Sequence, residues 1–282
     1  MSSSPRAATG SIAGSIGKHI VLIGFSILAV GPVLLILLNS FKERRSIFAD
    51  PLSLPTPTTF SLVGYETVFA RSDFPLYYFN SMSVTLISLG LVLTCATMIA
   101  FALSEYTFTG NKLLAVYFIL GIIIPIRLGS VSLLELVVSL RLVNTLTALI
   151  LVYTAQGLPL AVFILTQFMR QVPSEIKDAA RIDGANEYRV YWLILPLLRP
   201  AIATVAVLTM IPIWNDLWFP LILAPAPETR TVTMGAAQFL GQFANNWNAV
   251  LAALSLSAGP ILALYFVFSR QFLGGLTAGA VK

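Results

Sequence analysis

The chain has 282 residues, of which 57% are hydrophobic and only 10% are charged, and its mean hydropathy is +0.87. A soluble domain carries about 25% charged residues, so a soluble fold of this size would lack the polar side chains needed to cover its surface. The composition therefore predicts a membrane protein with many spans and little mass outside the membrane. The net charge of +5 comes from scattered lysines and arginines, which excludes a nucleic-acid-binding domain.

Long stretches without charged residues predict an all-α, polytopic membrane protein with six transmembrane helices. The predicted spans cover residues of about 20–41, 80–104, 111–129, 145–168, 200–223 and 249–269. The first stretch is too long for the apolar core of a signal peptide and no cleavage site follows it, so we interpret it as a retained helix. The charge-free core of the third ends at Ile126, so Arg127 is expected to snorkel or to face protein or water.

Six spans place both termini on the same side of the membrane, and the basic residues indicate which side. Lysine and arginine are enriched in the N-terminal segment 1–19, the loop 170–199 and the tail 270–282, which favours a cytoplasmic location for all three. The basic cluster 42–45 directly after the first span contradicts the positive-inside rule in this orientation. Charge alone therefore gives only a weak bias.

The predicted cytoplasmic loop 170–199 has the pattern of two short helices. Ser174 is placed to cap the first helix, and Gly184 is placed to end it because glycine tolerates a left-handed conformation. The second helix has four residues on one side: Tyr188, Tyr191, Trp192 and Leu195. Two short helices at an angle would form a knob that can enter a groove on another protein. An amphipathic loop lying on the membrane surface is the alternative.

This loop resembles the EAA motif of binding-protein-dependent ABC importers. The motif reads Glu-Ala-Ala, three residues, glycine, nine residues, and then Ile/Val-x-Leu-Pro. The matching residues here are Asp178-Ala179-Ala180, Gly184 and Ile194-Leu195-Pro196. Asp178 replaces the usual glutamate and keeps its charge, and Ile194 adjoins Leu195 without the intervening residue. The string Ala-Ala-Arg-Ile-Asp-Gly-Ala at 179–185 is the form typical of carbohydrate importers.

The resemblance extends over most of the chain. Further matching segments are Asn39-Ser40-Phe41-Lys42, Asn80-Ser81, Trp214-Asn215 with Pro220-Leu221, and the C-terminal residues 275–282. The first of these lies on the outer side of the membrane in the family, which favours a cytoplasmic N-terminus despite the basic cluster 42–45. The chain is most similar to the smaller, six-span permease subunit of maltose-type systems.

The resemblance implies a transport subunit with the type I ABC importer fold, multi-pass in the bacterial cytoplasmic (inner) membrane, with both termini cytoplasmic. Coupling to the ATPases would use Asp178, Ala179, Ala180, Asp183, Gly184, Ala185 and Tyr188. The tail would contact the ATPases through Gly275, Thr277, Gly279 and Lys282. The implied partners are a second permease subunit, two copies of an ABC ATPase and an extracytoplasmic sugar-binding protein, besides membrane lipid.

The sequence lacks a P-loop, a nucleophile with a base partner and a cluster of metal ligands, so we expect no enzyme activity, no catalytic residues and no metal site. The resemblance implies that ATP-Mg binds the partner ATPases and that this chain binds no cofactor. A self-contained secondary transporter or channel is the alternative. It would need ion-coupling groups at mid-membrane, and Arg127, Glu135 and Asp216 come nearest, all toward the outer face.

Sugar sites combine aromatic faces with polar side chains. Candidates facing the substrate path are Tyr153, Thr154 and Gln156 in the fourth span, and Trp214, Asn215 and Asp216 in the fifth. Helix packing or the aromatic belt at the membrane surface is the alternative role for these residues.

Overall fold

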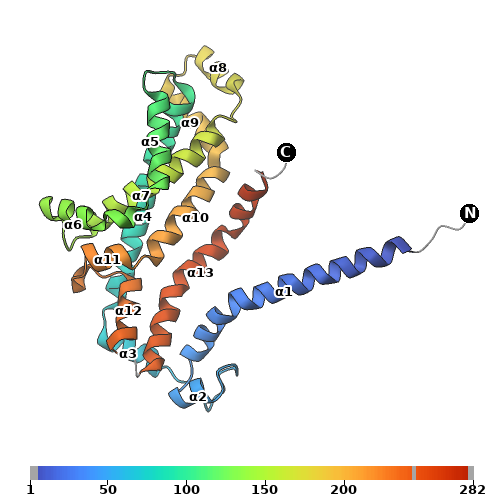
Figure 1. Ribbon diagram of the computed structural model, residues 1–282, viewed down its shortest axis with the longest axis vertical. Helices are drawn as coiled ribbons and strands as arrows, with labels where there is room; N and C mark the ends of the chain where they lie inside the picture. Colours follow the sequence, from blue (N-terminus) through green and yellow to red (C-terminus); the bar gives the residue numbers. More distant parts are fainter. Residues whose placement is uncertain (1–5, 243–245, 279–282) are drawn as a thin grey trace, which may run out of the picture. The chain divides into compact units, whose positions relative to one another are not determined.

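The computed structural model describes the backbone of residues 6–242 and 246–278 (Figure 1). Within these residues all the regular elements are helices, and the only β-type pairing is an isolated bridge between Lys42 and Phe60. The predicted all-α class is therefore confirmed. In chain order they are α1 (Arg6–Ser40), α2 (Arg44–Ala49), α3 (Val63–Arg71), α4 (Phe74–Glu105), α5 (Asn111–Ile123), η1 (Ile126–Gly129), α6 (Ser130–Ser139), α7 (Leu146–Met169), α8 (Ser174–Ile182), α9 (Glu187–Ile194), η2 (Leu195–Leu198), α10 (Arg199–Asn215), α11 (Trp218–Leu223), η3 (Pro227–Thr229), α12 (Val232–Gln242) and α13 (Trp247–Ala278).

Several of these helices are long and apolar enough to cross a membrane. In the part of the chain that the structure describes, four helical segments meet this criterion, and a bent fifth is added if α5 and the helices after it count as one crossing. The four segments are Gly17–Ser40, Phe74–Glu105, Leu146–Met169 and Glu187–Asn215. The sixth predicted span falls in α13, where Trp247–Ala263 is a shorter apolar helix. The number of six crossings stays a prediction.

Two of the predicted spans contain a break. Between α5 and the η1–α6 segment the chain turns by 84° at Pro125, which has no backbone N–H to continue a helix. The second break separates α10 from α11 at Asp216, whose backbone is extended, with ψ 133°. Four further prolines in the predicted spans, Pro32, Pro159, Pro212 and Pro260, lie inside helices that continue past them.

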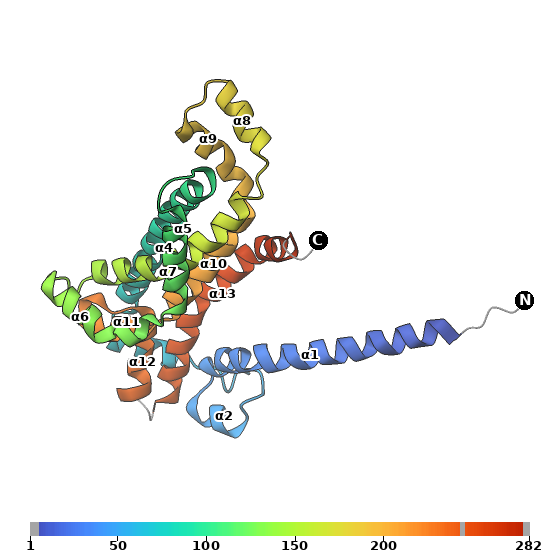
Figure 2. The ribbon, with the colours of Figure 1, turned by 45° about the horizontal axis from the view of Figure 1, so that its top comes forward.

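The chain divides into two compact units. Unit 1 comprises Met1–Ser72 and Gln238–Ser257, and unit 2 comprises Asp73–Ala237 and Ala258–Lys282. Figure 2 shows α8 and α9 together at one end of unit 2.

Unit 1 explains part of the basic cluster that contradicted the positive-inside rule. The side chain of Lys42 is fully buried, and its Nζ donates to the carbonyl oxygen of Asp50 at 2.9 Å and to Oγ of Ser53 at 3.3 Å. Asn248 donates from Nδ2 to the carbonyl oxygen of Lys42 at 2.7 Å. Lys42 therefore donates to acceptors inside the protein. The positive-inside rule concerns basic residues exposed in loops, and Lys42 is not one of these.

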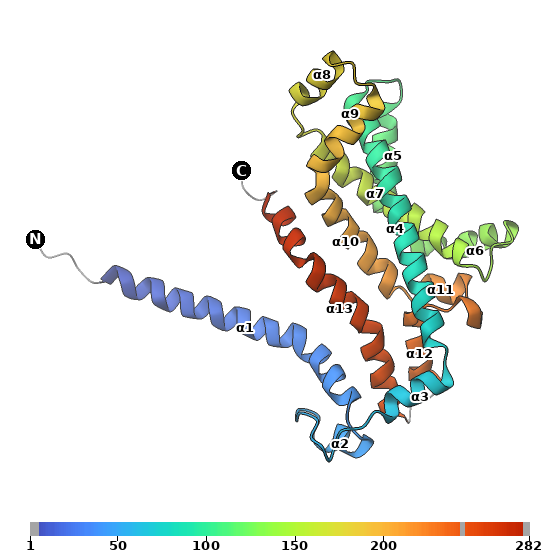
Figure 3. The same cartoon turned by 180° about the vertical axis from the view of Figure 1, so that it is seen from behind.

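The centre of unit 2 is formed by α4, α7 and α10, which lie side by side in Figures 1 and 3. Gly157 of α7 permits their close approach, because a Cβ atom there would lie 2.9 Å from Cγ2 of Val92 in α4 and 3.1 Å from Cγ2 of Thr209 in α10. Small buried residues such as Ala96 and Ala100 continue this contact toward the end of α4. The packing fixes the last residue of α4, Glu105, beside the α8–α9 loop.

Candidate coupling site

The α8–α9 loop confirms the predicted pair of short helices. Ser174 is the first residue of α8, and Pro173 precedes it with no side-chain cap, so the predicted Ser174 cap is not formed. Pro173 occupies the N-cap position instead, where its ring restricts φ, here to −53°. The second helix, α9, is capped by Asn186, whose Oδ1 accepts from the backbone N–H of Arg189 at 3.0 Å.

Gly184 ends α8 in the left-handed conformation that the sequence predicted. Its φ is +80°, and its N–H donates to the carbonyl of Arg181 at 3.0 Å. The N–H of Ala185 reaches back to the carbonyl of Ala180 at 2.9 Å. Such bonds satisfy the last carbonyls of a helix and fix the direction of the chain that leaves it.

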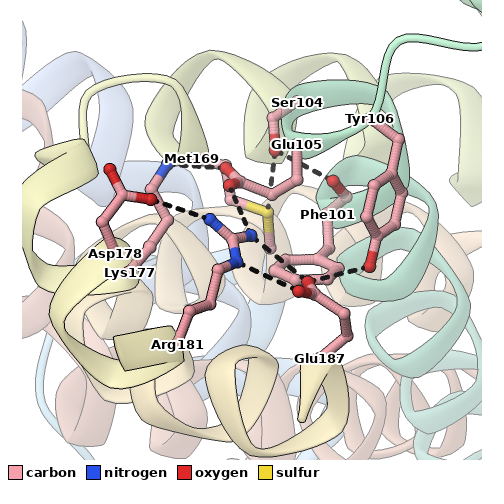
Figure 4. Close-up of polar contacts among 9 residues, drawn as sticks. All are labelled: Phe101, Ser104, Glu105, Tyr106, Met169, Lys177, Asp178, Arg181 and Glu187. Carbon is pink, nitrogen blue, oxygen red and sulfur yellow. Dashed lines mark hydrogen bonds and ion pairs between the residues drawn. The ribbon is translucent and has the colours of Figure 1, made fainter. Parts of the chain in front are cut away.

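A buried ion pair joins α8 to the end of α4 (Figure 4). Lys177 Nζ lies 2.6 Å from Oε1 of Glu105, and only 9% and 7% of the two side chains are exposed. Arg181 approaches the other oxygen of Glu105 at 3.6 Å. If the two helices separated, each buried charge would lose its partner, which is energetically costly. This contact therefore holds α8 in one position against α4.

Arg181 also joins α8 to α9. Its Nε and Nη2 donate to the two carboxylate oxygens of Glu187 at 3.0 and 3.2 Å, and Nη1 donates to Asp178 at 3.1 Å. The hydrogen bonds to Glu187 raise the pKa of the Arg181 guanidinium above its ordinary value. Tyr106 donates to Glu187 at 3.0 Å, and burial followed by this bond raises the pKa of the Tyr106 hydroxyl. The bend between the helices is therefore held by charge-assisted bonds.

We call Glu105, Tyr106, Lys177, Arg181 and Glu187 the loop anchor. Sequence reasoning did not single out these residues as a site, although Arg181 lies within the matched string. The only signal was an acidic residue at the end of an apolar span together with basic residues in the next loop predicted to be cytoplasmic, 170–199.

Apolar contacts hold the same loop from beneath. Val190 and Ile194 of α9 are fully buried in the cluster that includes α4 and α7, and Ala180 and Ala185 pack against it. The hydroxyl groups of Tyr191 and Thr97 lie 2.9 Å apart. The predicted one-sided arrangement of α9 is confirmed by a cavity of about 630 Å³, whose lining includes all four of its members: Tyr188, Tyr191, Trp192 and Leu195.

Much of the loop surface is exposed, part of the cavity lining included. Of the residues expected to couple to ATPases, Asp178, Ala179, Asp183, Gly184 and Tyr188 are exposed, and Ala180 and Ala185 are half-buried. Beside them Ile182 is 86% exposed, and Tyr188 itself is 75% exposed. An apolar tip on a firmly anchored loop is what a docking knob requires.

The six candidate path residues do not form one exposed surface. Tyr153, Trp214 and Asp216 are buried within unit 2, and the Tyr153 hydroxyl donates to Asp216 at 2.9 Å. Thr154 is half-buried and bonds its own helix, whereas Gln156 and Asn215 are exposed. A role for these residues in the substrate path stays a prediction.

The candidate tail contacts lie at the edge of the described chain. The backbone of α13 is helical as far as Ala278, so Gly275 and Thr277 belong to a helix. Gly279 and Lys282 lie outside the described residues.

Residues 10–273 match the model of a family described as the inner membrane component of binding-protein-dependent transport systems. The chain belongs to this family. The permease is 32% identical over 269 residues to the arabinooligosaccharides transport system permease protein AraQ of Halalkalibacterium halodurans, covering 93% of this chain and 96% of that protein. It is 31% identical over 268 residues to the diacetylchitobiose uptake system permease protein NgcG of Streptomyces coelicolor, covering 94% and 88%.

Solved structures show the same fold. The permease superposes with a TM-score of 0.81 and 20% identity on a chain from the crystal structure of a bacterial ABC transporter involved in the import of the acidic polysaccharide alginate. The match covers 96% of this chain and 100% of that one. At this identity the likeness establishes the ABC importer permease fold.

Proposed function

We propose that the permease is a subunit of an ATP-driven, binding-protein-dependent importer of a sugar, an oligosaccharide or a sugar derivative, and that it forms half of the translocation path. The observation that carries the proposal is the α8–α9 loop, whose inner side is held by the loop anchor while its tip is exposed. A knob of this kind can receive a push from an ATPase and pass it to α4 without deforming, as a rigid two-state element requires.

The substrate class rests on the relatives. Similar permeases carry names for arabinooligosaccharides, diacetylchitobiose and sulfoquinovosyl glycerol, all of which are sugars or sugar derivatives. Gln156 and Asn215 are the exposed polar members of the candidate path, so we place them ahead of the buried ones as contacts for sugar hydroxyl groups.

The partners in this proposal are a second permease subunit, two ABC ATPase subunits and an extracytoplasmic sugar-binding protein. ATP-Mg binds the ATPases, because this chain has no Gly-x-x-x-x-Gly-Lys-Ser/Thr sequence to hold phosphates. The tail residues Gly275, Thr277, Gly279 and Lys282 are proposed as a second contact with the ATPases.

Reconstitution tests the proposal. The permease would be assembled in lipid vesicles with the partner permease, the ATPases and the binding protein encoded beside it, and presented with a panel of arabino-, chito- and malto-oligosaccharides. We expect loaded binding protein to stimulate ATP hydrolysis and to be required for uptake. Uptake by the permease alone, driven by an ion gradient and indifferent to ATP, would establish a secondary transporter instead.

The proposed orientation places residues 42–73 outside the cell and the α8–α9 loop inside. After replacement of Cys95 by serine, we expect a cysteine at Thr58 to react with a membrane-impermeant maleimide in intact cells. A cysteine at Glu175 should react only after the membrane is permeabilised. Both positions are exposed in the structure, so a difference in labelling reports the side of the membrane. The reverse pattern would show that the cluster 42–45 is cytoplasmic.

A further inference from the structure

The two helix breaks of unit 2 are joined to each other by side chains. One break lies between α5 and α6, where Arg127 and Ser130 are located, and the other lies between α10 and α11, where Asp216 and Trp218 are located. These residues are distant in sequence, since Arg127 and Asp216 are 89 positions apart. We call the four residues the break ring.

Asp216 is the centre of the break ring. Its Oδ1 accepts from Nη2 of Arg127 at 3.2 Å and from the N–H of Trp218 at 3.3 Å. Its Oδ2 accepts from the hydroxyl of Tyr153 at 2.9 Å and from the N–H of Phe219 at 3.0 Å. The carboxylate thus caps the start of α11 and contacts α7 and η1 as well, with only 7% of its side chain exposed.

A second connection runs beside the ion pair. The indole Nε1 of Trp218 donates to Oγ of Ser130 at 2.9 Å. The hydroxyl of Ser130 donates in turn to the backbone carbonyl of Arg127 at 2.6 Å. The path from Arg127 through Asp216, Trp218 and Ser130 returns to Arg127, so two separate side-chain bonds connect the same pair of breaks.

The break ring lies at the far end of the helix that leaves the coupling loop. From α9 the chain passes through η2 directly into α10, whose 17 residues carry it about 25 Å from the loop. A helix transmits displacement along its axis, but a break would absorb it. We propose that the break ring passes the movement of α10 on to the α5–α6 break, so that both breaks move together when the ATPases act on the α8–α9 loop.

This inference rests on the proposed function and assigns Arg127 and Trp218 as positioning residues. The side chain of Arg127 is 66% exposed, and without it the Asp216 carboxylate still has three donors. The fold therefore does not depend on Arg127, and loss of the bond is expected to affect coupling rather than assembly.

The test compares Arg127→Gln, Trp218→Phe and the double variant in the reconstituted complex, with Arg141→Gln as a control at another exposed arginine. The measurement is the amount of sugar imported per ATP hydrolysed. Either connection alone can keep the two breaks linked. We therefore expect the import ratio to fall about twofold in each single variant and by up to about thirtyfold in the double variant. Arg127→Lys, which keeps the positive charge, should retain most of the wild-type import ratio.

Three results would overturn the inference. A double variant whose loss equals the product of the two single losses would mean that the bonds act independently. A fall in the abundance of the assembled complex would make the residues structural. A raised half-saturating concentration of loaded binding protein or sugar at an unchanged import ratio would place Arg127 in substrate recognition. A wild-type complex without binding-protein-stimulated ATP hydrolysis would refute the proposed function itself, on which the inference depends.

Discussion

Replacing Glu105 by glutamine is expected to abolish most sugar uptake while ATP hydrolysis continues. The substitution keeps the shape of the side chain but leaves the buried ammonium of Lys177 without its carboxylate, 2.6 Å away in the wild type. Breaking a buried ion pair in this way costs about 3–5 kcal/mol. A cost of this size exceeds the roughly 1.4 kcal/mol that changes an equilibrium tenfold, so most α8–α9 loops would lose their fixed position against α4.

Tryptic cleavage and transport together measure this effect. Cleavage after Lys177 and Arg181 should become faster in the detergent-solubilised Glu105→Gln permease, and uptake in vesicles should fall at least about tenfold. Glu175→Gln is the matched control, because Glu175 lies on α8, the helix of Lys177, but is exposed. Adding Lys177→Met to Glu105→Gln removes the uncompensated charge and should restore part of the protection at Arg181, the monitored cleavage site that this variant keeps. Unchanged cleavage and uptake in Glu105→Gln would refute the role of the loop anchor.

Gly184→Val is the second substitution with a large expected effect. Gly184 has φ +80°, and nothing lies within 4 Å of the position a Cβ atom would take, so the penalty is conformational rather than steric contact with a neighbour. A β-branched residue held at this φ costs about 1–3 kcal/mol. We expect the bend between α8 and α9 to change and uptake to be lost, while the permease still inserts into the membrane.

Asparagine at the same position provides the control, since it tolerates the left-handed conformation better than other residues with a side chain. Gly184→Asn should therefore retain clearly more uptake than Gly184→Val at equal abundance. The measurement is binding-protein-dependent uptake in vesicles, together with co-purification of the ATPases. If valine and asparagine reduced uptake equally, the loss would come from the presence of any side chain at the docking tip, and the special backbone conformation would not be its cause.

Much of this permease could be predicted from local features of its sequence. Charge-free stretches predicted the all-α membrane fold, because a helix needs about 20 consecutive apolar residues to cross the bilayer core. A glycine at the expected end of the first loop helix predicted a left-handed conformation at Gly184, since few other residues adopt it. The spacing of four residues on α9 predicted that they share one side of the helix, and Tyr188, Tyr191, Trp192 and Leu195 do line one cavity. Each of these properties depends on residues within a few turns of one another.

The tertiary structure decided which distant charges meet. Glu105 and Lys177 are 72 positions apart, and no periodicity connects them; they pair because α4 and α7 pack side by side, which places the end of α4 beneath the loop that follows α7. Asp216 was a candidate for the substrate path, but the break after α10 turns its carboxylate toward Arg127 and the start of α11. The sequence determined where charges interrupt the apolar helices. Their partners were decided by packing, because desolvated charges are stable only where the folded chain brings an opposite charge or a hydrogen-bond donor to them.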